Sequence, residues 1–141
     1  MFKYIKAMAY DKQTIMNDLM NKSQPLTDHL IKLYLFPSTE YAAHWRHEVW
    51  SFLNRIPKMK STGKLPSKDL IYSGISGYLD TSDNLMYLMM SEYDSSVPER
   101  TDIDELEAIL ADYFDWVSTK LSKDGVVVSK EVYKKLDELG L

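Results

Sequence analysis

The sequence contains no cysteine among its 141 residues. This absence excludes disulfide bonds, thiol catalysis, iron–sulfur clusters and zinc sites with cysteine ligands, and it favours a reducing compartment. The chain also has no apolar run near the roughly 20 residues that cross a bilayer. Lys3 and Lys6 interrupt the apolar start that a signal peptide needs. We therefore expect a cytoplasmic protein with no membrane partner.

Motifs that fix a reaction are missing too. Residues 61–64 contain a Gly-Lys pair, but they lack the spaced first glycine and the trailing hydroxyl residue of a P-loop. His44, His47 and Glu48 follow the order HxxHE, which differs from both helical zinc-protease patterns. We expect no catalytic residue, no bound metal and no cofactor. A metal-dependent hydrolase that uses the histidine or carboxylate clusters is the least favoured alternative.

Composition and periodicity indicate a helical fold. A hydrophobic fraction of 45% and a charged fraction of 27% are typical of a folded protein, and 141 residues suit one domain with one core. Apolar residues recur at helical spacing along most of the chain. The sequence therefore predicts an all-α fold, in which residues 1–141 form a single domain and six or seven helices make a bundle.

The strongest apolar stripe lies between two prolines and predicts a central helix at about 38–56. Pro37 ends the segment before it, and Pro57 ends the helix itself. At 100° per residue, seven side chains fall within an arc of roughly 120°. This predicted buried face consists of Tyr41, Ala42, Trp45, Val49, Phe52, Leu53 and Ile56.

Other helices are expected on both sides of the central one. Residues 2–21 are mainly helical, with a break near Tyr10 and Asp11, and 21–24 form a polar loop before a helix at 25–36. In that helix, His29 is expected at the edge of the core, bonded to the backbone.

The second half of the chain also predicts helices. Ser67 is expected to cap a helix at 68–79 in which Gly74 weakens the helix or allows close packing, and a further helix ends near Tyr93. Thr101 is expected to cap the next helix, and Ser129 the last one, which Gly140 ends. The helix after Thr101 carries the stripe Ile103, Leu106, Leu110, Tyr113, Phe114, Val117 and Leu121.

Three residues are candidates for contact with a partner protein. Trp50 lies about 120° from the centre of the apolar arc, and Arg46 precedes it by one turn, at the spacing of a cation–π contact. Trp116 lies at the margin of its own helix stripe. Tryptophan and arginine are enriched at binding hot spots; the alternative is that Trp50 covers the edge of the core. The leading hypothesis is a non-enzymatic adaptor or regulatory module that binds another protein or forms a homodimer.

A basic segment supports a second hypothesis. It is rich in lysine between two predicted helices and interrupted by prolines and a glycine, so it reads as a loop. The alternative function is nucleic-acid binding through Arg55, Lys58, Lys60, Lys64 and Lys68. No aromatic residues alternate with these lysines, and the net charge is −4, which both weaken this alternative.

Charge is divided unevenly along the chain. Residues 1–65 carry ten basic and five acidic residues, whereas residues 66–141 carry seven and sixteen. The division has two interpretations: attraction between the two halves within one fold, or a basic or acidic face for a partner of opposite charge.

Part of the chain resembles a known family. The run from His29 to Leu33, then Pro37, then Trp45 and Arg46, is similar to the HLLKW…P…WR pattern of the bacterial family called domain of unknown function twenty-nine. Residues 64–67 are similar to a later segment of that family. The resemblance covers about residues 26–70, and Leu33 stands where the family has tryptophan. It implies a bacterial, all-helical protein and carries over no catalytic residue.

Overall fold

The computed structural model describes residues 2–55, 67–76, 98–124 and 127–141. Within these ranges the chain forms helices and no strand, so the all-α prediction is confirmed for this part of the protein. The helices are α1 (Phe2–Leu35), α2 (Ala42–Arg55), α3 (Lys68–Ser76), α5 (Ile103–Asp124) and α6 (Ser129–Glu138). The predicted helix that ends near Tyr93 lies outside the described residues, so the expected number of helices stays a prediction.

Helix α1 is longer than the sequence predicts. The predictions of a break near Tyr10 and a loop at 21–24 are wrong, because one helix runs through both positions with Pro25 in its interior. An interior proline costs a helix about 3 kcal/mol. Leu19 and Leu26, on either side of Pro25, are almost completely buried. Burying two leucines contributes about 1.5–3 kcal/mol each, which is enough to offset the proline.

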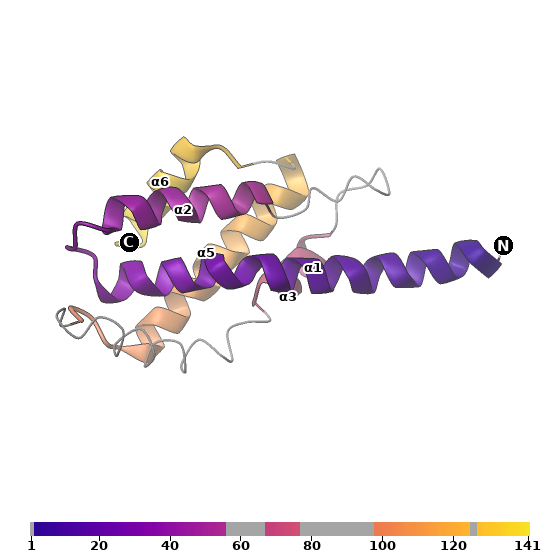
Figure 1. The fold of residues 1–141 in the computed structure, drawn as a ribbon, viewed down its shortest axis with the longest axis horizontal. Helices are drawn as coiled ribbons and strands as arrows, with labels where there is room; N and C mark the ends of the chain where they lie inside the picture. The colour runs from indigo at the N-terminus through magenta and orange to yellow at the C-terminus, as the bar shows by residue number, and fades with distance from the viewer. Residues whose placement is uncertain (1, 56–66, 77–97, 125–126) are drawn as a thin grey trace.

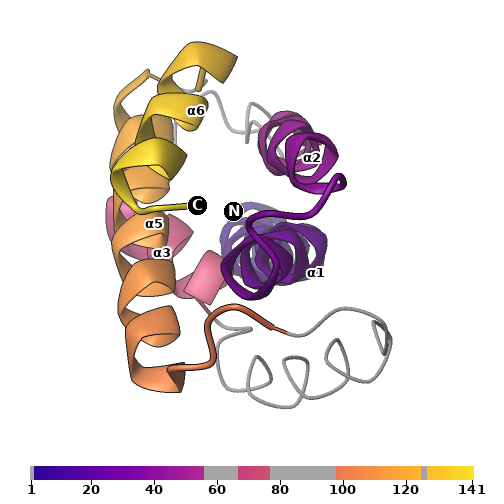
Figure 2. The same cartoon turned by 90° about the vertical axis from the view of Figure 1, so that its left-hand side faces the viewer.

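Helix α1 packs against more of the described helices than α2 does. It packs against α2, α3 and α5, whereas α2 packs against α1 and α6. In the end-on view, α1 and α2 lie on one side, α5 and α6 on the other, and α3 fills the space between α1 and α5 (Figure 2). The central position predicted for 38–56 is therefore not confirmed.

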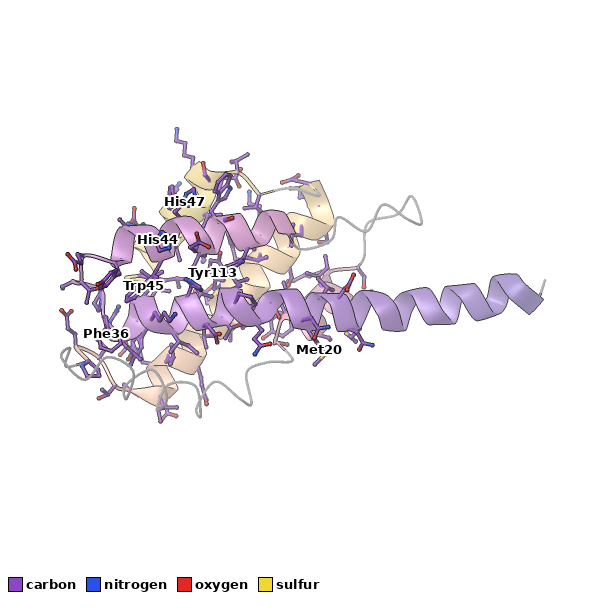
Figure 3. The ribbon with its side chains drawn as sticks, viewed as in Figure 1. Met20, Phe36, His44, Trp45, His47 and Tyr113 are labelled. Atoms are coloured by element: carbon purple, nitrogen blue, oxygen red, sulfur yellow. The ribbon has the colours of Figure 1, made fainter. Side chains whose placement is uncertain are left out.

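The predicted stripe of α2 is largely correct. Trp45, Val49, Phe52 and Leu53 are buried, and Trp45 lies between α2 and α1 (Figure 3). The prediction that Tyr41 is buried is wrong, because Tyr41 is 51% exposed. The helix starts at Ala42, later than the predicted start at about 38, so Tyr41 belongs to the preceding turn.

Helices α3 and α1 approach each other closely at Gly74. A Cβ atom built on this glycine would lie 2.5 Å from Cβ of Leu19. Gly74 and Leu19 are both buried, so the close packing that the sequence allows at Gly74 is confirmed. The Ser67 hydroxyl accepts a hydrogen bond from the backbone N–H of Leu70 at 3.3 Å, which confirms the predicted cap.

The stripe of α5 is confirmed: six of its seven predicted residues are buried and Ile103 is half-buried. The N-terminal cap of α5 differs from the prediction, because the Asp102 carboxylate, not Thr101, accepts the N–H of Glu105 at 3.2 Å.

In α6 the N-cap residue is Val128, without a side-chain cap, because the helix already includes Ser129. Gly140 ends α6 with a positive φ of 74°, as expected of a glycine there.

The carboxyl end of α1 is capped by a segment far away in sequence. The carbonyls of Leu33, Tyr34 and Leu35 have no partner inside the helix. Arg100 donates hydrogen bonds to the first two, and the backbone N–H of Glu99 donates to the third at 2.8 Å. These bonds fix the start of the α5 segment against the end of α1.

One buried polar atom in this core has no partner. The side chain of Tyr113 is fully buried, and its hydroxyl makes no hydrogen bond to the described residues. Burial in these apolar surroundings raises the pKa of Tyr113 above its usual range. A buried hydroxyl without a partner costs free energy that an apolar group of the same shape does not.

We therefore expect Tyr113→Phe to raise the free energy of unfolding by about 1–2 kcal/mol. The matched control is Tyr34→Phe, because the Tyr34 side chain is also buried but its hydroxyl donates to the carbonyl of Asp102 at 3.1 Å. This variant should lose about 1 kcal/mol. Urea unfolding followed by circular dichroism measures both; a loss of stability in Tyr113→Phe would contradict the prediction.

The amino-terminal half of α1 extends past the other described helices (Figure 1). No described helix is long and apolar enough to span a membrane.

Candidate functional site

The histidines of α2 do not assemble a metal centre. The described residues contain no group of three or more histidines and acids placed to hold a metal ion. His44 Nε2 lies 3.8 Å from Glu48 one turn further on, and the ring of His47 lies 5.5 Å from that of Trp50. Figure 3 places His47 on the side of α2 away from α1. These side chains pair locally.

His29 occupies the position predicted for it at the edge of the core. Its Nδ1 lies 2.7 Å from the carbonyl oxygen of Pro25. Because that oxygen only accepts, Nδ1 must carry the proton. The ring packs on Phe52 with centroids 5.0 Å apart, and burial lowers the pKa of His29 below its usual value. Backbone bonding and packing account for this histidine without a catalytic role.

Arg46 makes contacts within the protein. Its Nη2 donates to the backbone carbonyl of Tyr133 at 3.0 Å and pairs with the carboxylate of Asp137. Its guanidinium lies 5.6 Å from the centre of the Tyr133 ring, whereas the sequence spacing pointed to Trp50 as the stacking partner. Arg46 therefore joins α2 to α6.

Trp50 is partly covered by the core. It is half-buried and packs against the core, one turn after Arg46 on α2. Its indole nitrogen is buried and makes no hydrogen bond to the described residues. The indole is thus mostly covered by the protein itself, as in the alternative interpretation of the sequence.

Trp116 lies in a pocket. It is half-buried on α5, and its ring lies 5.8 Å from that of Tyr113, which connects it to the core. The pocket has a volume of about 220 Å³ and opens between α5 and α6. Its lining consists of Trp116, Lys120, Glu131, Lys134, Lys135 and Glu138.

Two ion pairs cross between α5 and α6 on either side of Trp116. Lys120, one turn after the tryptophan, lies 2.8 Å from Glu131. Asp112, one turn before it, lies 3.1 Å from Lys135. These pairs bridge the two helices above and below the indole, so Trp116 is an apolar surface inside a charged rim.

The lining lysines differ in their pairing. Lys135 lies 4.0 Å from Glu138 in addition to Asp112, and only 14% of its side chain is exposed. Lys120 is paired with Glu131, which raises the pKa of Lys120 through a hydrogen bond. Lys134 is exposed and has no acidic partner in the described part of the chain. The ammonium of Lys134 therefore has no ion pair with the described residues.

Of these lining residues, only Trp116 was predicted from the sequence as a contact residue. The spacing of Glu131, Lys134, Lys135 and Glu138 does show a polar stripe on one side of the last helix. It does not show which helix this stripe faces, because that depends on how Val132 and Leu136 are buried in the core.

The basic segment is mostly outside the described residues. Arg55 is the last residue of α2, and Lys58, Lys60 and Lys64 fall within 56–66, which the structure does not describe. Lys68 begins α3 and lies 2.9 Å from the carboxylate of Asp115. Lys68 thus has an acidic partner of its own, and nucleic-acid binding by this segment stays a prediction.

In the part of the chain that the structure describes, ion pairs form mostly within the acidic second half. Among the ion pairs of the described residues, Arg46–Asp137 joins the basic first half to the acidic second half. Four further pairs lie entirely within the second half, namely Lys68–Asp115, Lys120–Glu131, Lys135–Asp112 and Lys135–Glu138.

Comparison with protein-family models, curated proteins and solved structures finds no match. The resemblance of residues 26–70 to the bacterial family stays a prediction.

Proposed function

We propose that this protein is a small, non-enzymatic helical module that binds another protein, and that the α5–α6 face around Trp116 is its contact surface. The observation that carries the proposal is a half-buried tryptophan in an open pocket with a rim of ion pairs. Binding hot spots have this composition: an aromatic residue in a pocket, surrounded by polar residues. Because the sequence has no cysteine, the proposal places the module in the cytoplasm.

The size of the pocket favours a protein partner over a small molecule. Sites for cofactors and drug-sized ligands have volumes of about 300–1,000 Å³. The pocket beside Trp116 has about 220 Å³ and is bordered by four charged side chains of α6. This space suits a single anchoring side chain from a larger partner, whose remaining surface would cover the rim.

Arg46 has an indirect part in this proposal. Arg46 holds α6 through Tyr133 and Asp137, whereas Trp50 packs against the core. Since α6 supplies four of the six lining residues, the position of α6 determines the shape of the pocket. Arg46 therefore supports the surface that Trp116 presents.

The proposal predicts that Trp116→Ala removes binding of the main partner. Truncation of a hot-spot residue costs about 2 kcal/mol or more, or about a thirtyfold loss of affinity. The tagged full-length protein is purified from the cells that encode it, and co-purifying proteins are quantified by mass spectrometry. We expect at least one of them to fall about tenfold or more in the Trp116→Ala sample. Size-exclusion chromatography with light scattering tests whether the partner is a second copy.

The control variant is Ser73→Ala, because Ser73 is exposed on α3 and does not line the pocket. Circular dichroism spectra of both variants establish that each remains folded. If every co-purifying protein is recovered equally well with Trp116→Ala, and the protein is monomeric, the α5–α6 face is not the contact surface.

A further inference from the structure

The pocket also indicates the chemistry of its partner. Building on the function proposed above, we infer that the α5–α6 pocket receives one apolar side chain from a peptide segment of the partner, and that an adjacent carboxylate of that segment pairs with Lys134. The inference depends on three features: the indole of Trp116, the ion pairs on either side of it, and the ammonium of Lys134, which has no acidic partner among the described residues.

The walls of the pocket are suited to an apolar side chain. Trp116 contributes its indole to the lining. The side chain of Lys135 is only 14% exposed, so its methylene groups, rather than its ammonium, form much of the wall beside the indole. The ammonium is directed to Asp112 at 3.1 Å. Phenylalanine, leucine or methionine would bury its surface here without breaking an ion pair.

The charges of the rim favour an acidic neighbour to that side chain. Lys120 and Lys135 are already paired with Glu131 and Asp112. A carboxylate at Lys134 would gain an ion pair without displacing an existing one. A cationic neighbour would meet Lys134 as a like charge and would have to compete with Lys120 for Glu131.

The competing chemistry is a basic side chain stacked on Trp116. An arginine or lysine over the indole would gain a cation–π contact, and Glu138 offers a carboxylate only 4.0 Å from Lys135. The charge of Lys134 opposes this arrangement. The two kinds of ligand predict opposite responses to a change of charge at residue 134.

Four short peptides measure separately how the apolar side chain and its charged neighbours contribute to binding. The probes are acetylated and amidated tripeptides: Asp-Phe-Asp, Asn-Phe-Asn, Lys-Phe-Lys and Asp-Ala-Asp. Each is titrated to about 10 mM into the ¹⁵N-labelled full chain. The readout is the indole N–H signals of its three tryptophans, assigned with single Trp→Phe variants. The buried indole nitrogen of Trp50 serves as an internal control.

We expect Asp-Phe-Asp to shift the Trp116 signal and leave that of Trp50 unchanged. Asn-Phe-Asn should bind about two- to fivefold more weakly, the effect of one exposed ion pair, and Lys-Phe-Lys more weakly still. Loss of the aromatic ring in Asp-Ala-Asp should weaken binding about tenfold or more. Tighter binding of Lys-Phe-Lys than of Asp-Phe-Asp would overturn the inference in favour of the cation.

Lys134→Glu is the decisive variant, since it should reverse the order of the acidic and basic peptides. Its matched control is Lys130→Glu, which makes the same change of charge at an exposed position of α6 that does not line the pocket. This control should keep the order. Equal effects of the two variants would mean that only long-range charge is involved and would overturn the pairing with Lys134.

Failure of this inference is distinguishable from failure of the proposed function. If no peptide shifts the Trp116 signal, the pocket does not take an anchored acidic segment. A loss of co-purifying protein with Trp116→Ala would then still support the α5–α6 face as a contact surface that works without such an anchor.

Discussion

Arg100→Ala is expected to lower the free energy of unfolding by about 2–4 kcal/mol. The Nε of Arg100 donates to the carbonyl of Tyr34 at 2.9 Å and its Nη2 to that of Leu33 at 3.3 Å. Its guanidinium also lies 4.6 Å from the centre of the Tyr34 ring. The variant leaves two carbonyls at the end of α1 without their donor, in a part of the chain where the side chains are fully buried.

The comparison with Arg100→Lys identifies which property of the arginine matters. Lysine keeps the positive charge near the carboxyl end of α1, which favours cations, but it lacks the planar fork that reaches two carbonyls at once. We expect Arg100→Lys to lose more than half as much stability as Arg100→Ala. Chemical denaturation measures both, and equal stability of Arg100→Lys and the unchanged protein would show that charge alone is sufficient.

Gly74→Val is expected to cost about 3 kcal/mol. The new Cβ would lie 2.5 Å from Cβ of Leu19 and 2.9 Å from its Cδ1. The Cβ of leucine is fixed to the backbone and cannot move aside, so α3 must shift away from α1. This shift would also disturb α5, which packs against α3.

Ser73→Val is the matched control for this substitution. It places the same β-branched side chain on the same helix, at a neighbouring position that is exposed. Helix propensity for valine is slightly better than for glycine, so any loss at residue 74 comes from packing. Thermal unfolding should show a lower midpoint for Gly74→Val only. A similar decrease in both variants would mean that α3 and α1 do not meet closely at Gly74.

The sequence predicts best where a helix buries one regular stripe. The seven residues predicted for α5 all face the core. Of the seven predicted for the 38–56 helix, the structure describes six, and four of these are buried. In both helices the apolar residues recur with the helical period, which local sequence shows directly. Tyr41 was misplaced because the helix starts one residue after it, and the ends of helices depend on hydrogen bonds formed in the turn.

Local signals failed where tertiary contacts outweighed them. Pro25 and the polar residues before it are typical of a loop, yet buried leucines on both sides keep α1 continuous. Arg100 lies in what reads as a polar turn, and its bonds to α1 span 66 and 67 residues. No local pattern reports such a contact.

In the candidate site too, the sequence shows which residues stand out but not which other helix covers them. Trp116 stands out in the sequence because a large aromatic residue lies at the margin of an apolar stripe. Arg46 and Trp50 stand out for similar reasons, but in the structure Arg46 bonds to α6 and Trp50 packs against the core. Whether an aromatic residue at such a margin is covered or open depends on which helix lies across it, and the helical period does not contain this information.

The extension of α1 beyond its neighbours has a consequence for how this helix unfolds. At about 1.5 Å per residue its 34 residues span about 51 Å, and the turns around Leu19 are clamped by α3. Isolated helices of about 12–15 residues are marginal in water because their first turn is costly to nucleate. Here the clamped turns act as a permanent nucleus, so the outer turns can fray from Phe2 inward and re-form while the core stays intact.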